Sequence, residues 1–323
     1  MRRRQFISLA GSAVAVWPLS GHAQRPAQPV VGFLRLTVEG AEDFVAAFRQ
    51  GVREAGLVEG ESVVIEVRSA DGRRDRMPAL VSDLLRIPAS VIVGGGFSPE
   101  MQAAAGTVPV VFVYGSDPIR DGIVGSLRRP GGNVTGVTFL TTALAAKQLE
   151  LLHALVPAVT TIGYLVDADN FANPSAVADV QAAAPALGAR VIVATVGTEA
   201  EIDAAFAAFA EQRVGAFMVA GGQFFLSRRR QIVALAARHA LPAMYENRAF
   251  TTAGGLASYS GDIPDAYRQA GIYAGRLVRG ANPADLPVVQ GTRVALVLNL
   301  RTARTLGITF PPDLLARADE VIE

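Results

Sequence analysis

The chain has 323 residues, of which 50% are hydrophobic and 18% are charged, and its formal net charge is +1 at pH 7. This length and composition predict a folded protein with room for two hydrophobic cores, and they exclude a disordered chain. A nearly neutral chain without a long basic run lacks the charge that nucleic-acid binding requires. The absence of cysteine excludes disulfides, thiolate catalysis and cysteine-ligated metals.

The first 23 residues have the pattern of an export signal. Arginines at positions 2–4 precede an apolar run at 6–19, and Gly21-His22-Ala23 provides a cleavage site. The run is shorter than the ~20 residues that a membrane span needs. We predict a signal peptide at 1–23, of the general secretory or the twin-arginine type, and a periplasmic mature chain without a membrane span. Removal of the signal peptide leaves 27 basic and 29 acidic residues, a net charge of −2.

Apolar strands then alternate with amphipathic helices. In the first half we expect strands at 30–36, 62–68, 90–93 and 108–113, helices at 41–55 and 73–86, and an exit segment at 133–139. In the second half we expect strands at 161–166, 190–195, 216–219, 242–245, 255–259 and 294–299, and helices at 144–155, 175–187, 199–212, 226–239, 263–279 and 302–306. This alternation is typical of an α/β fold with parallel sheets covered on both faces.

The two halves resemble each other. Val31-Gly32-Phe33-Leu34 recurs 131 residues later as Ile162-Gly163-Tyr164-Leu165, and a glycine-rich strand end at 93–97 recurs at 219–224. Solenoid repeats are shorter, roughly 20–50 residues. The repeat therefore predicts two Rossmann-like lobes with a ligand cleft between them. We place one lobe at 29–137 plus about 262–293 and the other at 138–261 plus about 294–323, with crossings near 137–141, 258–262 and 294–299.

Ligands of open parallel sheets bind beyond the carboxyl ends of the strands. The loops at those ends contain the residues that we predict to bind the ligand: Leu36, Thr37, Gly95, Gly96, Phe97, Ser98, Tyr114, Gly115, Ser116, Asp117, Asp167, Asn170, Gly222, Gln223, Phe224, Tyr245, Glu246, Tyr259 and Asp262.

Several of these residues have two interpretations. The run 94–98 opens a helix and offers backbone N–H groups to a carboxylate, or it is only a tight turn. It lacks the order of a dinucleotide fingerprint or a phosphate loop. Ser116 could donate to a carboxylate. Asp117 could accept from an ammonium or cap the turn before Pro118, and Asp262 stands where a helix cap is the default role. Glu246 follows a strand end and is a candidate for contact with a cation.

The aromatic residues at strand ends could stack on a ligand or pack at the sheet edge; they are Phe97, Tyr114, Phe224, Phe225, Tyr245 and Tyr259. As a group they predict a ligand with an apolar or aromatic part. His153 and His239 belong to no nucleophile elbow or metal-spaced cluster. We therefore expect a binding protein without catalytic residues, metal or cofactor.

Five segments give the chain a family resemblance: residues 2–7, Phe48-Arg49-Gln50-Gly51, the run Arg-Pro-Gly-Gly-Asn-Val-Thr-Gly at 129–136, and residues 266–273 and 314–323. The chain resembles the ABC-transporter substrate-binding proteins of the tryptophan/tyrosine-binding type. The resemblance implies a type I periplasmic-binding fold and a receptor that delivers a small molecule to an ABC permease and its ATPase.

Such a receptor closes its lobes around the ligand. We expect docking on Gly95, Gly96, Ser98 and Ser116 of the first lobe, followed by closure of Phe224, Tyr245 and Tyr259 from the second. The best interpretation of the ligand is an amino acid or another small carboxylate with an apolar part. A ligand-sensing module for a membrane sensor kinase and, less favoured, a two-lobed transferase are the alternatives.

Overall fold

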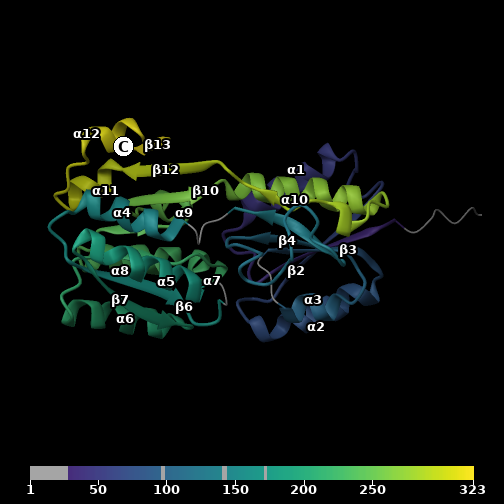
Figure 1. Ribbon diagram of the computed structural model, residues 1–323, viewed down its shortest axis with the longest axis horizontal. Helices are drawn as coiled ribbons and strands as arrows, with labels where there is room; N and C mark the ends of the chain where they lie inside the picture. The colour runs from purple at the N-terminus through teal and green to yellow at the C-terminus, as the bar shows by residue number, and fades with distance from the viewer. Residues whose placement is uncertain (1–27, 96–98, 140–143, 171–172) are drawn as a thin grey trace, which may run out of the picture.

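The computed structural model describes residues 28–95, 99–139, 144–170 and 173–323, which form two lobes side by side along the long axis of the molecule (Figure 1). Each lobe is built around one sheet. The predicted α/β class with two Rossmann-like lobes is confirmed. The predicted signal peptide at 1–23 and the predicted ligand-binding residues Gly96, Phe97 and Ser98 lie outside the described residues.

The first lobe has a six-stranded sheet in which every neighbouring pair is parallel. Its spatial order is β11 (Val289–Gln290), β5 (Val134–Thr138), β4 (Val110–Tyr114), β3 (Ala89–Gly95), β1 (Val30–Arg35) and β2 (Val64–Ser69). Figure 1 shows α1 (Glu42–Glu54) and α10 (Ile263–Val278) over one face, and α2 (Met77–Arg86) and α3 (Pro99–Ala105) over the other. Two 3-10 helices, η1 (Arg74–Arg76) and η4 (Pro283–Asp285), complete the lobe.

The second lobe has a seven-stranded sheet. Its order is β13 (Glu320–Ile322), β12 (Val294–Asn299), β10 (Ala257–Gly261), β9 (Ala243–Tyr245), β8 (Ala216–Val219), β6 (Thr161–Asp167) and β7 (Arg190–Val196). Its helices are α4 (Ala145–Leu155), α5 (Asn173–Ala183), η3 (Ala184–Leu187), α6 (Glu199–Glu211), α7 (Gln223–Ser227), α8 (Arg229–Arg238), α9 (Arg248–Thr252), α11 (Leu300–Thr305) and α12 (Pro312–Ala316).

The repeat seen in the sequence is present in the strand order. The series β2-β1-β3-β4-β5 of the first sheet matches β7-β6-β8-β9-β10 of the second. Gly32 and Gly163 occupy the same place in the two copies, and each makes room for a helix side chain. A Cβ on Gly32 would lie 2.6 Å from Cδ1 of Leu84, and one on Gly163 would lie 2.8 Å from the ring of Phe209.

The strands β10 and β12 are antiparallel, whereas we expected only parallel sheets. The cause is the path of the chain. It leaves the second sheet at Gly261, builds α10 and β11 in the first lobe, and returns directly into β12 opposite the point of departure, where Val294 pairs with Gly261. A chain that re-enters a sheet at the end from which it left must run against the strand that left.

Three crossings join the lobes and lie close together. They run from β5 to α4, from β10 to α10 and from β11 to β12. The N–H of Asp262 donates to the carbonyl of Arg293 at 3.1 Å, and the N–H of Gly291 donates to the carbonyl of Thr138 at 2.7 Å. We expected the third crossing near 294–299, but that segment is strand β12. The crossing lies before it, between β11 and β12. The proposed division of the chain into moving lobes, with limits at 137, 262 and 294, stays a prediction.

Helix α10 packs on α1 through glycine. A Cβ on Gly51 would lie 1.8 Å from the carbonyl oxygen of Arg268, and one on Gly271 would lie 2.2 Å from that of Phe48. The two helices therefore touch backbone to backbone, which only glycine permits. This contact holds a late segment of the chain against the first helix. Within the described ranges, no helix is long and apolar enough to cross a membrane.

Candidate functional site

The carboxyl ends of the strands in the two sheets meet between the lobes. Gln223, at the start of α7 in the second lobe, spans two strand ends of the first. Its side-chain oxygen accepts from the N–H of Leu36 at 3.0 Å, and its Nε2 donates to the carbonyl of Gly95. Leu36 follows β1 and Gly95 ends β3. One side chain thus joins the ends of β1 and β3 to the end of β8.

A second bond between the lobes is an ion pair. Nη2 of Arg74, in η1, donates to Oδ2 of Asp167 at 2.6 Å. Asp167 ends β6, and its side chain is only 2% exposed, whereas that of Arg74 is 37% exposed. The N–H of Asp169 donates to the other carboxylate oxygen of Asp167 at 3.1 Å. Both oxygens of this buried acid are therefore occupied.

Four predicted residues of the second lobe form one cluster beside this ion pair. Nδ2 of Asn170 donates to the carbonyl of Gly221 at 2.8 Å. A Cβ on Gly222 would lie 3.5 Å from Oδ2 of Asp167 and 3.6 Å from Nδ2 of Asn170. The N–H of Gly222 in turn supports the carboxyl group of Glu246. Asp167, Asn170, Gly222 and Glu246 thus lie together beyond β6, β8 and β9.

Burial changes the chemistry of Glu246. The residue is 4% exposed, and loss of hydration raises its pKa from the ordinary 4.5 to about 8, against a smaller opposing effect of the Gly222 N–H. Its carboxyl group is therefore mostly protonated at neutral pH. It is then a neutral hydrogen-bonding group rather than an anion.

Arg35, the last residue of β1, is not among the predicted ligand-binding residues. It is nevertheless the largest fully buried side chain in the described ranges and only 1% exposed. Nε donates to the carbonyl of Thr37 at 3.0 Å, and Nη1 donates to the hydroxyl of Tyr267. The guanidinium carbon lies 5.4 Å from the ring centre of Phe44 and 5.1 Å from that of Tyr267. The sequence does hold a signal for Arg35, because it is a charged residue inside the otherwise apolar run 31–36.

Gly95 makes this position of Arg35 possible. A Cβ on Gly95 would lie 2.5 Å from the hydroxyl oxygen of Tyr267 and 2.9 Å from Nη1 of Arg35. A side chain at position 95 would therefore displace both groups. The backbones of Gly95 and Thr37, both predicted to bind the ligand, thus lie against the guanidinium group.

Arg120, which is also not among the predicted residues, makes a third link between the lobes. Its Nη2 donates to Oγ of Ser175 at 2.6 Å and approaches Oγ of Ser116 at 3.4 Å, and its Nη1 lies 3.3 Å from Oδ2 of Asp179. Ser116, a predicted docking residue, is fully buried, and its carbonyl accepts from the hydroxyl of Thr138 at 2.8 Å.

Three other predicted residues bond mainly within their own lobe. The hydroxyl of Tyr114, next to the half-buried Gly115, donates to Oδ2 of Asp121 at 2.7 Å. Oδ1 of Asp117 accepts from two N–H groups of its own turn, and Oδ1 of Asp262 accepts from the N–H of Asp265 at 3.0 Å. The last two are the capping roles that we weighed as alternatives. A role of these residues in ligand contact stays a prediction.

The predicted aromatic contacts in the second lobe differ in burial. Tyr245 is fully buried and stacks on Phe250 with ring centres 4.8 Å apart. Phe224 is half-buried against Phe225 at 5.3 Å, and Tyr259 is half-buried with its carbonyl bonded to Gln148. Phe224 and Tyr259 therefore keep some surface free, and contact of all three with a ligand stays a prediction.

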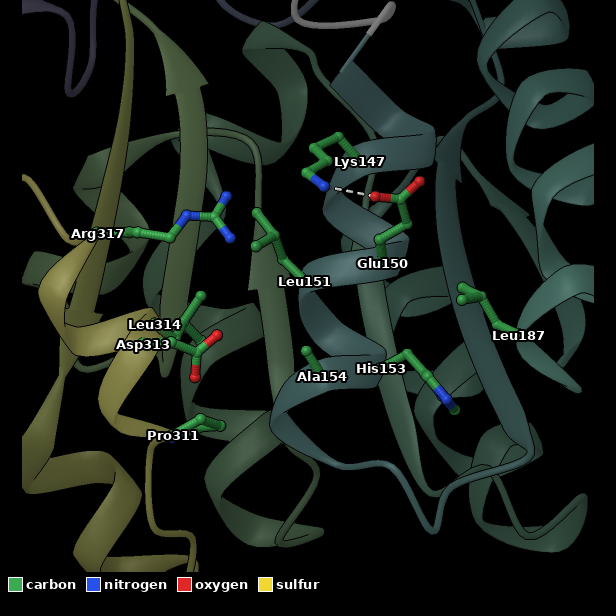
Figure 2. Close-up of a pocket in the computed structure, with 10 residues that line it drawn as sticks. All are labelled: Lys147, Glu150, Leu151, His153, Ala154, Leu187, Pro311, Asp313, Leu314 and Arg317. Atoms are coloured by element: carbon green, nitrogen blue, oxygen red, sulfur yellow. Dashed lines mark hydrogen bonds and ion pairs between the residues drawn. The ribbon is translucent and has the colours of Figure 1, made fainter.

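A separate pocket of about 410 Å³ lies on the outer part of the second lobe, between α4 and α12 (Figure 2). The ion pair Lys147–Glu150, at 2.6 Å, and the side chains of Asp313 and Arg317 line it. None of its lining residues is among those predicted to bind the ligand. In the described parts of the chain, no group of three or more acidic or histidine side chains is placed to hold a metal ion.

Two lobes with mainly parallel sheets, joined by three crossings and with a site between their strand ends, define the class of two-lobed type I periplasmic binding proteins. The chain belongs to the ABC transporter substrate binding protein family, whose model matches residues 36–322.

Known proteins agree with this assignment. The chain is 27% identical to the ABC domain from Streptococcus pneumonia solved in complex with L-Trp, covering 92% of this chain and 100% of that one with a TM-score of 0.84. It is 23% identical to a conserved domain protein from Vibrio cholerae, over 91% and 99% of the two chains, with a TM-score of 0.83. It is also 21% identical over 264 residues to the tyrosine-binding protein of Clostridioides difficile (strain R20291), covering 81% of this chain and 75% of that protein. The predicted family and fold are confirmed.

Proposed function

We propose that this protein is the extracytoplasmic receptor of an ABC importer and delivers a small molecule to an ABC permease and its ATPase. The main support is the position of the site. Groups from both lobes converge between the strand ends, where Gln223 bonds to Leu36 and Gly95 and Arg74 bonds to Asp167. A ligand held there contacts both lobes at once, so its binding energy favours the closed arrangement. The permease then recognises the closed surface.

The ligand is an amino acid or another small carboxylate with an apolar or aromatic part. Two relatives support this class, one solved with L-Trp and one named for tyrosine binding. The partly free aromatic surfaces of Phe224 and Tyr259 provide an apolar wall. The backbone N–H groups predicted at 96–98 would receive a carboxylate at the start of α3.

The lobes move as bodies about the three crossings. We place one body at 29–137 plus 262–293 and the other at 138–261 plus 294–323. The side-by-side crossings near Thr138, Gly261 and Gly291 form a narrow hinge. Export through the predicted signal at 1–23 would deliver the mature chain to the periplasm.

A thermal-shift screen of residues 24–323 tests the receptor function. The protein is unfolded and refolded to remove carried-over ligand, then mixed with amino acids, aromatic acids, nucleosides and sugars. A ligand at ~100 times its dissociation constant stabilises by roughly 2.7 kcal/mol, enough to raise the melting temperature by several degrees. We expect shifts with amino acids or aromatic acids. A protein that refolds but responds to no compound would contradict the proposal.

The sole tryptophan, Trp17, lies in the predicted signal, so the mature protein is free of indole fluorescence.

The transporter partner is tested separately, by deletion of the gene. Uptake of the radiolabelled ligand should be lost when the gene is deleted and restored by the intact gene. Normal uptake in the deletion strain, with a lost transcriptional response to the ligand, would favour the sensory alternative.

A further inference from the structure

The buried Arg35 at the end of β1 lacks a counterion among the described residues. Arg35 is buried, yet no acid among the described residues forms an ion pair with it. Asp167 is already paired with Arg74 at 2.6 Å, and both of its oxygens are bonded. Glu246 is mostly protonated at neutral pH, because its burial opposes ionisation. Arg35 is therefore a buried positive charge at the end of β1 without a partner of opposite charge among the described residues.

A buried guanidinium without a counterion is costly, and it stays charged because arginine does not lose its proton in proteins. The rings of Phe44 and Tyr267 and the carbonyl of Thr37 supply only partial charges. Burial also raises the pKa of Tyr267, so its hydroxyl remains neutral. Two of the three guanidinium nitrogens donate to these groups, and the third, Nη2, makes no bond to the described residues.

The guanidinium lies at the edge where the lobes meet. Its Nε bonds to Thr37, just beyond β1, and its Nη1 lies against Gly95 at the end of β3. Gln223 of the second lobe bonds to the backbone at the same two strand ends. Separation of the lobes breaks those bonds and uncovers the edge beside Arg35.

We propose that Arg35 binds the acidic group of the ligand and that the site selects small organic anions with an apolar part over zwitterionic amino acids of the same shape. The proposal rests on the proposed receptor function and narrows its ligand class. The planar guanidinium suits a carboxylate, which would supply the missing negative charge. An α-ammonium group would need a free acid. The buried Asp167 at the end of β6 is occupied by Arg74, and Oδ1 of Asp117, just beyond the end of β4, accepts from two N–H groups of its own turn.

Matched pairs of ligands test the proposal on the unaltered mature protein. Calorimetric titration compares L-tryptophan with indole-3-propionate and L-phenylalanine with 3-phenylpropionate, so that each pair differs only in the ammonium group. We expect each deaminated acid to bind at least about tenfold more tightly, and tryptamine, which lacks the carboxylate, not to bind. Tighter binding of the amino acids would overturn the proposal and leave the receptor function intact. Failure of all these compounds, together with a negative screen, would count against both.

Variants then separate charge from structure. Arg35→Gln removes the charge and should abolish binding of the propionates, while Arg35→Lys should retain part of it. Tyr267→Phe, which loses only the hydroxyl partner, should bind them within a few fold of the wild type. Arg317→Gln, at an arginine in the outer pocket, is the matched control. A folded Arg35→Gln protein, judged by circular dichroism, that binds the propionates normally would overturn the role of Arg35.

The variant Arg74→Ala tests the ligand preference without changing Arg35. It frees the buried carboxylate of Asp167, which then becomes available to an ammonium group. The preference should therefore shift toward the amino acid of each pair, measured as the ratio of the two dissociation constants. An unchanged ratio would show that occupancy of Asp167 does not set the selectivity.

Discussion

The two lobes share a scaffold and differ in the charges at its edge. β1 and β6 occupy equivalent places in their sheets, with Gly32 and Gly163 in register. The first strand ends in a buried arginine, Arg35, whereas the second ends in a buried acid, Asp167. Residues inside the strands serve packing that both lobes need, so they are alike. Residues at the carboxyl ends face the other lobe, so they are free to differ. The repeat explains the fold, and the departures from it identify the site.

The largest effect should come from the helix contact of the first lobe. Gly51→Ala places a methyl group against the backbone carbonyl of Arg268, which has no rotamer with which to move away. We expect a loss of about 3 kcal/mol or more in the free energy of unfolding, at the upper end for overpacking. Chemical denaturation measures it, and Gly125→Ala, where an added Cβ meets nothing within 4 Å, is the control. Equal stability of the two variants would refute this account of the α1–α10 contact.

The matched glycines test whether the lobes pack alike. Gly32→Ala meets the side chain of Leu84, and Gly163→Ala meets the ring of Phe209. A leucine changes rotamer more easily than a buried phenylalanine, so we expect Gly163→Ala to cost more, within about 1–3 kcal/mol for each. Denaturation midpoints decide the order. The reverse order would show that the first lobe is the more rigid of the two.

Glu246 should make stability depend on pH. Its folded pKa of about 8 lies above the ordinary 4.5, so the folded state favours the protonated form. The contribution of Glu246 to the free energy of unfolding is therefore largest below about pH 4.5. It is lost as the pH rises through about 8, a loss of a few kcal/mol at most. The free energy of unfolding measured at pH 5, 7 and 9 should decline less for Glu246→Gln. Parallel curves for the two proteins would assign the decline to another group.

Gln223 should contribute to closure more than to folding. Gln223→Ala removes two hydrogen bonds between the lobes, each worth about 1 kcal/mol. We expect roughly tenfold weaker ligand binding and a larger radius of gyration by small-angle X-ray scattering, with little change in melting temperature. Gln231→Ala, whose side chain bonds within the second lobe, provides the comparison. An unchanged radius and affinity would contradict the bridging role.

The smallest effect concerns Asp262. If it only caps α10, Asp262→Ala costs about 1 kcal/mol of stability and leaves ligand affinity unchanged. Thermal unfolding and calorimetric titration are measured together. Thr198→Ala, at the capping box of α6, is the matched loss of a cap in the second lobe. A loss of ligand affinity in Asp262→Ala but not in Thr198→Ala would show that Asp262 contributes to ligand binding.

The sequence predicted much of the fold, because period and repetition are local signals. Apolar alternation located most strands, and the repeat near Gly32 and Gly163 indicated two lobes. The antiparallel pair β10–β12 was missed, since strand direction depends on where the chain returns and not on the composition of residues 294–299. The short elements α9, β11 and β13 were also missed, because two to five residues give no clear period.

The sequence predicted which loops form the site, but not which side chains bond to one another there. Asp167, Asn170, Gly222 and Glu246 meet because the carboxyl ends of parallel strands share one edge. Arg74 and Arg120, by contrast, resemble ordinary surface charges in the sequence. Their partners lie 93 and 55 residues away in the other lobe, so only the arrangement of the lobes reveals them.

The backbone contact between α1 and α10 constrains how the chain is made. A helix at 42–54 cannot cover its packed face until residues 263–278 have left the ribosome. The second sheet likewise waits for β12 and β13, near the end of the chain. The first lobe therefore waits for residues 263–290 and the second for residues 294–322, so neither sheet is complete until these late segments have emerged. Separately expressed halves should accordingly be insoluble, while the two halves produced together should assemble.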